Sequence, residues 1–134
     1  MTQGLRGADL EGLVAPLGQL QGLDLSGATL YWASLGDADL SFADLSDADL
    51  RGAMLYRTRC RGTKFCRANL GRDNLNGRTD LKGADLSTVD LTDANLRDAI
   101  YDEATTFPSG FDPTAAGMTH VDHLPLANRG KSPG

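Results

Sequence analysis

The stretch that decides the fold is residues 33–52, which read ASLGD ADLSF ADLSD ADLRG. Units of this kind run from residue 23 to residue 103, sixteen in all, with one extra residue, Arg78, after the eleventh. In extended chain the side chains alternate sides, so the first residue of a unit, often Ala, and the third, usually Leu, face the same way. The second residue, often Asp or Asn, faces outward, and the last two turn the chain.

This period predicts a coil rather than a helix, because a five-residue spacing distributes leucines around every face of a helix. Four units close a square coil of twenty residues, and coils stack at about 4.8 Å. We therefore expect an all-β fold, a right-handed quadrilateral parallel β-helix with about four regular coils and irregular caps. Its predicted structural core is Leu25, Leu30, Leu35, Leu40, Leu45, Leu50, Leu55, Cys60, Phe65, Leu70, Leu75, Leu81, Leu86, Leu91, Leu96 and Tyr101.

The repeated A(D/N)LXX units resemble the pentapeptide-repeat family over about 80 of the 134 residues. The resemblance implies a right-handed quadrilateral β-helix. The stretch AIYDEATTFP at 99–108, followed by GFDP at 110–113, is also similar to the terminal segment of cyanobacterial members.

The repeat also sets the expected boundaries. Open strand edges at the ends of a solenoid must be covered, so we expect an irregular capping coil at 1–22, the solenoid at 23–104 and a cap at 105–118. The cap would place Phe107 and Phe111 over the last leucine column. Residues 119–134 lack periodicity and are expected to be extended or disordered. Arg78 and Asp73 are interpreted as one local distortion, with Asp73 bonding backbone donors.

Composition limits the partners and the location. The net charge of −5 and the pI near 4.8 argue against nucleic acid and anionic membranes as direct partners, because both require a basic surface. The sequence contains no apolar run long enough to span a membrane and no secretory signal, so we expect a cytoplasmic protein.

Charge alternates along the array. Residues 23–50 carry six acids and no base, residues 51–82 nine bases and two acids, and residues 83–103 six acids and one base. In the expected register Asp39, Arg59 and Asp80 share one outward column and Asp44, Lys64 and Asp85 the next, while Asp37 faces Arg57 and Asp47 faces Arg67. We interpret the pattern as ion pairing between coils that sets their register. The alternative is a basic belt that binds an acidic partner.

The sequence predicts no enzyme, no catalytic residue and no cofactor. No histidine lies inside the repeat array to activate a serine, and a short solid rod offers no cleft. The motif HVDH at 120–123 is the sole support for a weaker alternative, a metal-binding tail. Cys60 is expected to point inward and Cys66 outward, which excludes a bridge between them.

Exposed aromatic residues are the remaining signal. Tyr31 and Trp32 occupy adjacent outward or corner positions, with Arg51 one coil further, and these residue types anchor interfaces. They form a candidate interaction surface, unless the N-terminal coil or the tail covers them. The sequence thus favours a non-enzymatic structural or protein-interaction module with an unknown protein partner, as a monomer or an end-to-end dimer. The family resemblance implies an alternative, a DNA-mimic inhibitor of a type II topoisomerase such as gyrase.

Overall fold

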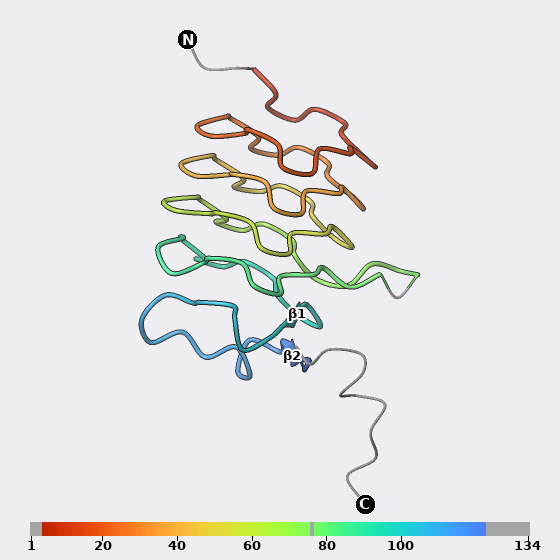
Figure 1. The fold of residues 1–134 in the computed structure, drawn as a ribbon. Helices are drawn as coiled ribbons and strands as arrows, with labels where there is room; N and C mark the ends of the chain where they lie inside the picture. The colour runs from red at the N-terminus through yellow and green to blue at the C-terminus, as the bar shows by residue number, and fades with distance from the viewer. Residues whose placement is uncertain (1–3, 76, 123–134) are drawn as a thin grey trace, which may run out of the picture.

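The computed structural model describes residues 4–75 and 77–122, which form a rod of stacked coils (Figure 1). Parallel β-bridges join residues twenty positions apart, such as Asp24 with Asp44 and Thr29 with Asp49. Four such ladders run along the described residues, one for each five-residue unit of a coil. Two longer strands, β1 (Ile100–Tyr101) and β2 (Thr119–His120), pair in parallel at the C-terminal end. No helix within the described ranges is long and apolar enough to cross a membrane.

The inward positions of each unit build the core, as the sequence predicts. Leu40, Leu45, Ala38 and Ala43 are completely buried, and the same holds for their equivalents along the middle of the rod. Each fully buried leucine contributes about 1.5–3 kcal/mol relative to an exposed one. No single unit could bury its own leucine, so the stability of each coil depends on the coils stacked against it.

The corners are tight turns fixed by hydrogen bonds. The amide of Ala43 donates to the carbonyl of Leu40 at 3.0 Å, and Phe42, inside this turn, has a positive φ of 62°. The outward Asp39 accepts the amide of Ser41 at 2.9 Å, which holds the chain as it enters the corner. This local bond gives the outward aspartates of the repeat a structural purpose.

The N-terminal segment differs from the irregular coil that we expected. Bridges from Gly4 to Asp24 and from Val14 to Ser34 continue the ladders in the normal offset, so residues 4–22 form a regular coil. The sequence obscures this regularity because Leu13 and Ala15 exchange the large and the small inward residue of their unit. Both side chains pack against the core.

The register changes at the predicted distortion. Met54 pairs with Asp80 instead of Asn74, and Arg59 pairs with Asp85 instead of Asp80. Both offsets are twenty-six residues, whereas a single extra residue at Arg78 predicts twenty for Met54 and twenty-one for Arg59. The segment between Gly71 and Thr79 is therefore six residues longer than its equivalent in a regular coil. With one extra residue, Leu81 would follow Leu40 and Cys60 in one inward column, and Leu86 would follow Leu25, Leu45 and Phe65 in the next. In the structure Leu86 and Leu91 take these places, so this expectation from the sequence is wrong.

Leu75 is the one predicted core leucine that the new register places outside. Its side chain is 74% exposed, so its assignment to the core was wrong. The physical reason lies in its unit, which would put the carboxylate of Asp73 into the inward position usually held by Ala, at a high cost in desolvation. Thr79 takes that inward position instead, and its hydroxyl lies 3.0 Å from the carbonyl oxygens of both Leu50 and Gly71.

The C-terminal end is covered by aromatic side chains. The rings of Tyr101 and Phe107 meet edge to face at 5.4 Å, and Phe107 stacks on Phe111 at 5.2 Å. Residues 119 and 120, which we had assigned to an extended or disordered tail, belong to β2, so the tail boundary at 119 was placed too early. Residues 123–134 of the predicted tail lie outside the described residues.

Candidate interaction surface

The three residues of the predicted surface lie together. The rings of Tyr31 and Trp32 are 5.9 Å apart in an edge-to-face arrangement, and the guanidinium of Arg51 lies 4.6 Å from the centre of the Tyr31 ring. Asp49 holds Arg51 in place through an ion pair of 2.7 Å. The cluster is therefore fixed in position, and Trp32 remains 44% exposed.

Trp32 is held flat against the next coil. A side chain at Gly52 would place its Cβ 2.3 Å from Cδ1 of Trp32, so only glycine leaves room for the indole. Trp32 itself has a φ of 56°, in a region that bulky residues seldom adopt and that costs roughly 1–2 kcal/mol. The indole N–H donates a hydrogen bond to the carboxylate of Asp73.

Asp73 organises the segment that leaves the coil, which we call the excursion loop (residues 72–78, of which 76 is not described). Its Oδ1 accepts the amides of Leu75 at 2.8 Å and of Gly77 at 2.6 Å. These backbone bonds are those that the sequence predicts for Asp73. The hydrogen bond from Trp32 is the main cause that holds the pKa of Asp73 below its ordinary value, and the two amides add to it. In Figure 1 the loop extends sideways from the rod near residue 75.

A small hollow separates the loop from the first coil. It has a volume of about 140 Å³, and Glu11, Tyr31, Trp32, Asp73, Asn74 and Leu75 line it. The N-terminal coil thus contributes Glu11 to its border and leaves Trp32 accessible. Leu75 presents its apolar side chain at the same place.

The outward column beside this cluster lacks charge over its first three positions. It consists of Val14, Ser34 and Met54, followed by Asp80 and Ile100. Val14 is 72% exposed and Met54 is 41% exposed. We call Val14, Ser34 and Met54, with Trp32 and Leu75 on one side and Tyr56 on the other, the apolar face.

The other three outward columns are polar along their length. Each contains two or more acids among its described residues, and two of them also contain a base. They are Gly4, Asp24, Asp44, Lys64 and Asp90; Asp9, Thr29, Asp49, Asn69 and Asn95; and Gln19, Asp39, Arg59, Asp85 and Thr106.

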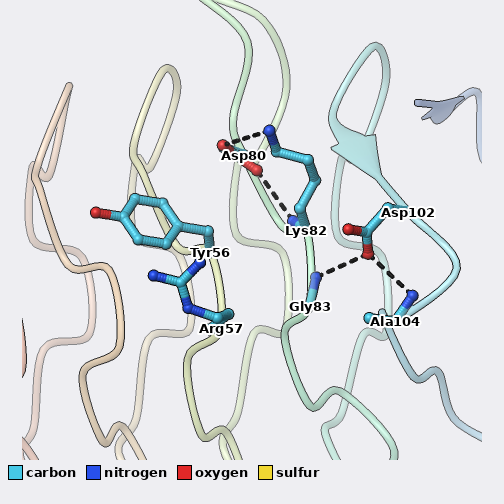
Figure 2. Close-up of a pocket in the computed structure, with 7 residues that line it drawn as sticks. All are labelled: Tyr56, Arg57, Asp80, Lys82, Gly83, Asp102 and Ala104. Atoms are coloured by element: carbon cyan, nitrogen blue, oxygen red, sulfur yellow. Dashed lines mark hydrogen bonds and ion pairs between the residues drawn. The ribbon is translucent and has the colours of Figure 1, made fainter. Parts of the chain in front are cut away.

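A wider groove borders the apolar face on the side of Tyr56 (Figure 2). It has a volume of about 480 Å³, and Arg57, Asp80, Lys82 and Asp102 are among its lining residues. The guanidinium of Arg57 lies 4.8 Å from the centre of the Tyr56 ring, and Figure 2 shows the two side chains next to each other. Asp102 accepts the amides of Gly83 and Ala104, each at 3.0 Å.

The two bases of this groove form ion pairs within the molecule. Arg57 forms a two-pronged bond with Asp37 on the previous coil, at 2.8 Å for each prong. Lys82 lies 3.7 Å from Asp80. Both bases of the groove are therefore already paired with carboxylates of the protein.

The predicted ion pairs between coils are confirmed for Asp37 with Arg57 and for Asp47 with Arg67. The predicted acid–base–acid columns keep their order of signs but change their last member. Because of the longer excursion, Arg59 is followed by Asp85 rather than Asp80, and Lys64 by Asp90 rather than Asp85.

The cysteines lie as the sequence predicts. Cys60 is buried in the core, where loss of hydration raises its pKa to about 12, and Cys66 is half-buried at the surface. Among residues 4–75 and 77–122 no group of three His, Cys, Asp or Glu side chains could hold a metal ion. His120 packs edge to face on Tyr101 at 5.1 Å, and His123 of the HVDH motif lies outside the described residues.

Sequence reasoning found the Tyr31, Trp32 and Arg51 cluster but missed Val14, Met54 and Leu75. For the first two a signal is present. Outward positions spaced by twenty residues carry no charge at Val14, Ser34 and Met54, which becomes visible once the N-terminal coil is included in the array. The position of Leu75 depends on the register after the excursion, and the period alone does not give it.

Stacked parallel coils built from five-residue units define the chain as a β-helical repeat protein. The family of pentapeptide repeats matches residues 5–41, 33–72 and 77–100 in eight copies, and the chain belongs to this family. The matched ranges leave out residues 73–76, which are in the excursion loop.

Several solved structures are similar to this chain. The pentapeptide repeat protein alr5209 from Nostoc PCC 7120 is 32% identical over 85% of this chain and 77% of its own, with a TM-score of 0.36. HetL, involved in heterocyst differentiation regulation in Nostoc sp. strain PCC 7120, is 31% identical over 84% of this chain, with a TM-score of 0.50. The chain spans 57% of HetL. QnrB1, a plasmid-mediated fluoroquinolone resistance protein, is 18% identical with a TM-score of 0.26. The search of curated proteins gave no match.

Proposed function

We propose that this chain is a non-enzymatic protein-interaction module and that the apolar face is its binding surface. The observation that carries the proposal is the uncharged outward column of Val14, Ser34 and Met54, beside the exposed ring of Trp32. Aromatic residues and Met are enriched at protein interfaces, and charged residues are depleted at their centres. The other three columns carry the charges that keep a surface in water.

The packing of the rod supports a role without catalysis. Its interior is filled by side chains such as Leu40, Leu45 and Phe65, which are completely buried. Chemistry would therefore be confined to open grooves, where water competes with every interaction. A rigid rod with one apolar side is suited to hold a partner in a fixed orientation.

The relation to HetL fits a role through binding. HetL is involved in the regulation of heterocyst differentiation. The two proteins are 31% identical over 84% of the present chain. We infer that the chain acts on another protein by contact, in the cytoplasm, as a right-handed coil that is monomeric or dimeric through its ends.

Photo-crosslinking tests this function. A photoreactive residue placed at Ser34 reports on the apolar face, and the same residue at Thr29 is the matched control, because Thr29 holds the corresponding outward position on the neighbouring side of the same coil. In extract of the native cell we expect a discrete adduct from position 34 and none from position 29. Equal adducts from both positions would contradict the proposal.

The alternative from the sequence, a DNA-mimic inhibitor of gyrase, requires continuous negative potential along the rod. The net charge of −5 favours it. The bases Arg59 and Lys64 interrupt two of the acidic columns, which weakens it. A supercoiling assay separates the two functions, because a DNA mimic inhibits gyrase at micromolar protein and a module that binds through the apolar face does not.

A further inference from the structure

The backbone of Ser34 and Met54, beneath the apolar face, is hydrogen-bonded to the neighbouring coils. The amide of Ser34 donates to the carbonyl of Leu13 on one neighbouring coil at 2.7 Å, and the amide of Leu35 donates to the carbonyl of Met54 on the other at 2.9 Å. Met54 repeats this pattern, with its amide bonded to the carbonyl of Ala33 at 2.8 Å. These bonds run along the axis of the rod, between coils, and do not point outward.

This arrangement decides which kind of peptide can lie on the face. An extended peptide gains most of its affinity by adding a strand to an open sheet edge. The side of the rod is no such edge, so an extended peptide placed there would leave its own backbone groups without partners, which is costly. A helix satisfies its backbone internally and offers only side chains.

The dimensions and the charge of the face also suit a helix. The uncharged positions Val14, Ser34 and Met54 are spaced by about 4.8 Å and span roughly 10 Å, which is about two turns of a helix. Trp32 lies two residues before Ser34, and Tyr56 lies two residues after Met54, so aromatic rings flank the column on both sides. The net charge of −5 attracts a partner whose polar flanks are basic.

We propose that the apolar face binds an amphipathic α-helix of a partner protein, with its apolar stripe on Val14, Ser34 and Met54 and basic residues on its flanks. The proposal rests on the proposed function and names the chemistry of the partner. It places the partner helix along the rod axis, between Trp32 and Tyr56.

A synthetic peptide tests the proposal with the intact protein. The probe is a helix of about 18 residues, made of Leu and Lys with the leucines in one stripe. A peptide of the same composition with scrambled order is its control. Trp32 is the single tryptophan of the chain, so its fluorescence reports on the face directly. We expect the striped peptide to shift the Trp32 emission to shorter wavelength and to protect it from iodide, and the scrambled peptide to do neither.

Two variants locate the binding site. Ser34→Arg places a charge at the centre of the face, whereas Thr29→Arg adds the same charge at the equivalent outward position of the next side. Both should fold, because Arg59 occupies an outward position of the same kind. We expect Ser34→Arg to weaken binding of the striped peptide roughly tenfold or more, and Thr29→Arg less than about twofold.

Equal binding by the two variants would overturn the proposal, because binding would then be a general charge effect. Absence of any Trp32 response to the striped peptide would overturn it as well, and this readout needs no variant. After either result, the proposed function can still be tested by crosslinking from position 34. A partner that crosslinks at Ser34 while the helical peptide does not bind would retain the proposed function and reject the helix.

Discussion

The indole of Trp32 donates its N–H to the carboxylate of Asp73, a residue 41 positions later in the chain. Asp73 also accepts the amides of Leu75 and Gly77, so one carboxylate fixes both the exposed tryptophan and the loop beside it. The excursion loop is therefore held against Trp32 by this hydrogen bond and forms one side of the apolar face.

Removal of this carboxylate should release the loop. Asp73→Ala deletes the acceptor of the Leu75 and Gly77 amides, each bond being worth about 1 kcal/mol. We expect amide hydrogen exchange at Leu75 and Gly77 to become roughly tenfold faster and the Trp32 emission to move to longer wavelength, with the core amides unchanged. Asp73→Asn, which keeps the shape and one oxygen acceptor, should give a smaller change. Unchanged exchange at both amides in Asp73→Ala would show that other contacts hold the loop.

A methyl group at residue 52 should displace the tryptophan. Gly52 has a φ of +73°, and an added Cβ would lie 2.3 Å from Trp32 and 3.0 Å from Asp73. Gly27 is the matched control, with a φ of +68° and no atom closer than 3.9 Å. Both Ala variants carry the backbone strain of roughly 1–2 kcal/mol. Urea unfolding should show a larger loss for Gly52→Ala, and only this variant should change the Trp32 emission; identical results for the pair would contradict the packing.

The two thiols should differ in reactivity. Burial raises the pKa of Cys60 to about 12, and partial burial and the nearby Asp90 raise the pKa of Cys66 as well. Because the thiolate is the reactive form, we expect iodoacetamide to modify Cys66 slowly and Cys60 only after unfolding. Peptide mass spectrometry after a timed reaction measures both. Equal labelling of the two cysteines in the native protein would mean that Cys60 is not in the core.

Acid should destabilise the rod. The hydroxyls of Ser26, Ser87 and Thr92 donate to Asp24, Asp85 and Asp90, each at 2.6 Å, and hold the pKa of these carboxyls below the ordinary value of 3.8. A folded pKa below the unfolded one means that the stabilisation is present above 3.8 and is lost as the pH falls through the folded value. We expect the free energy of unfolding to be nearly constant from about pH 7 to pH 5 and to fall below about pH 4. A rise in stability at low pH would contradict these bonds.

Periodicity predicted much of this molecule because each position of a unit has one physical task. The inward Leu and Ala, the turn positions and the pairs Asp37–Arg57 and Asp47–Arg67 all follow from it. The regular first coil is not evident from the period, because Leu13 and Ala15 exchange the large and the small inward residue. Leucine is therefore missing from the third position of that unit. The sequence indicates that Asp73 does not fit an inward position, but it does not give the length of the excursion loop. That length depends on whether Asn74 or Asp80 pairs with Met54.

The register after residue 71 determines which residues lie on the apolar face. With one extra residue, Asn74 would follow Met54 in the column and Leu75 would enter the core. In the structure Asp80 follows Met54, and Leu75 stands outside. The composition of the face and its neighbouring loop therefore depends on this single change of offset.

Comparison of Leu75→Ala with Leu70→Ala measures this offset most directly, since the two leucines hold the same position in adjacent sequence units. Leu70 is buried, so Leu70→Ala should lower the free energy of unfolding by about 2–5 kcal/mol. Leu75 is exposed, so Leu75→Ala should change it by no more than about 0.5 kcal/mol. A loss of several kcal/mol for both variants would place Leu75 in the core and contradict the register on which the apolar face depends.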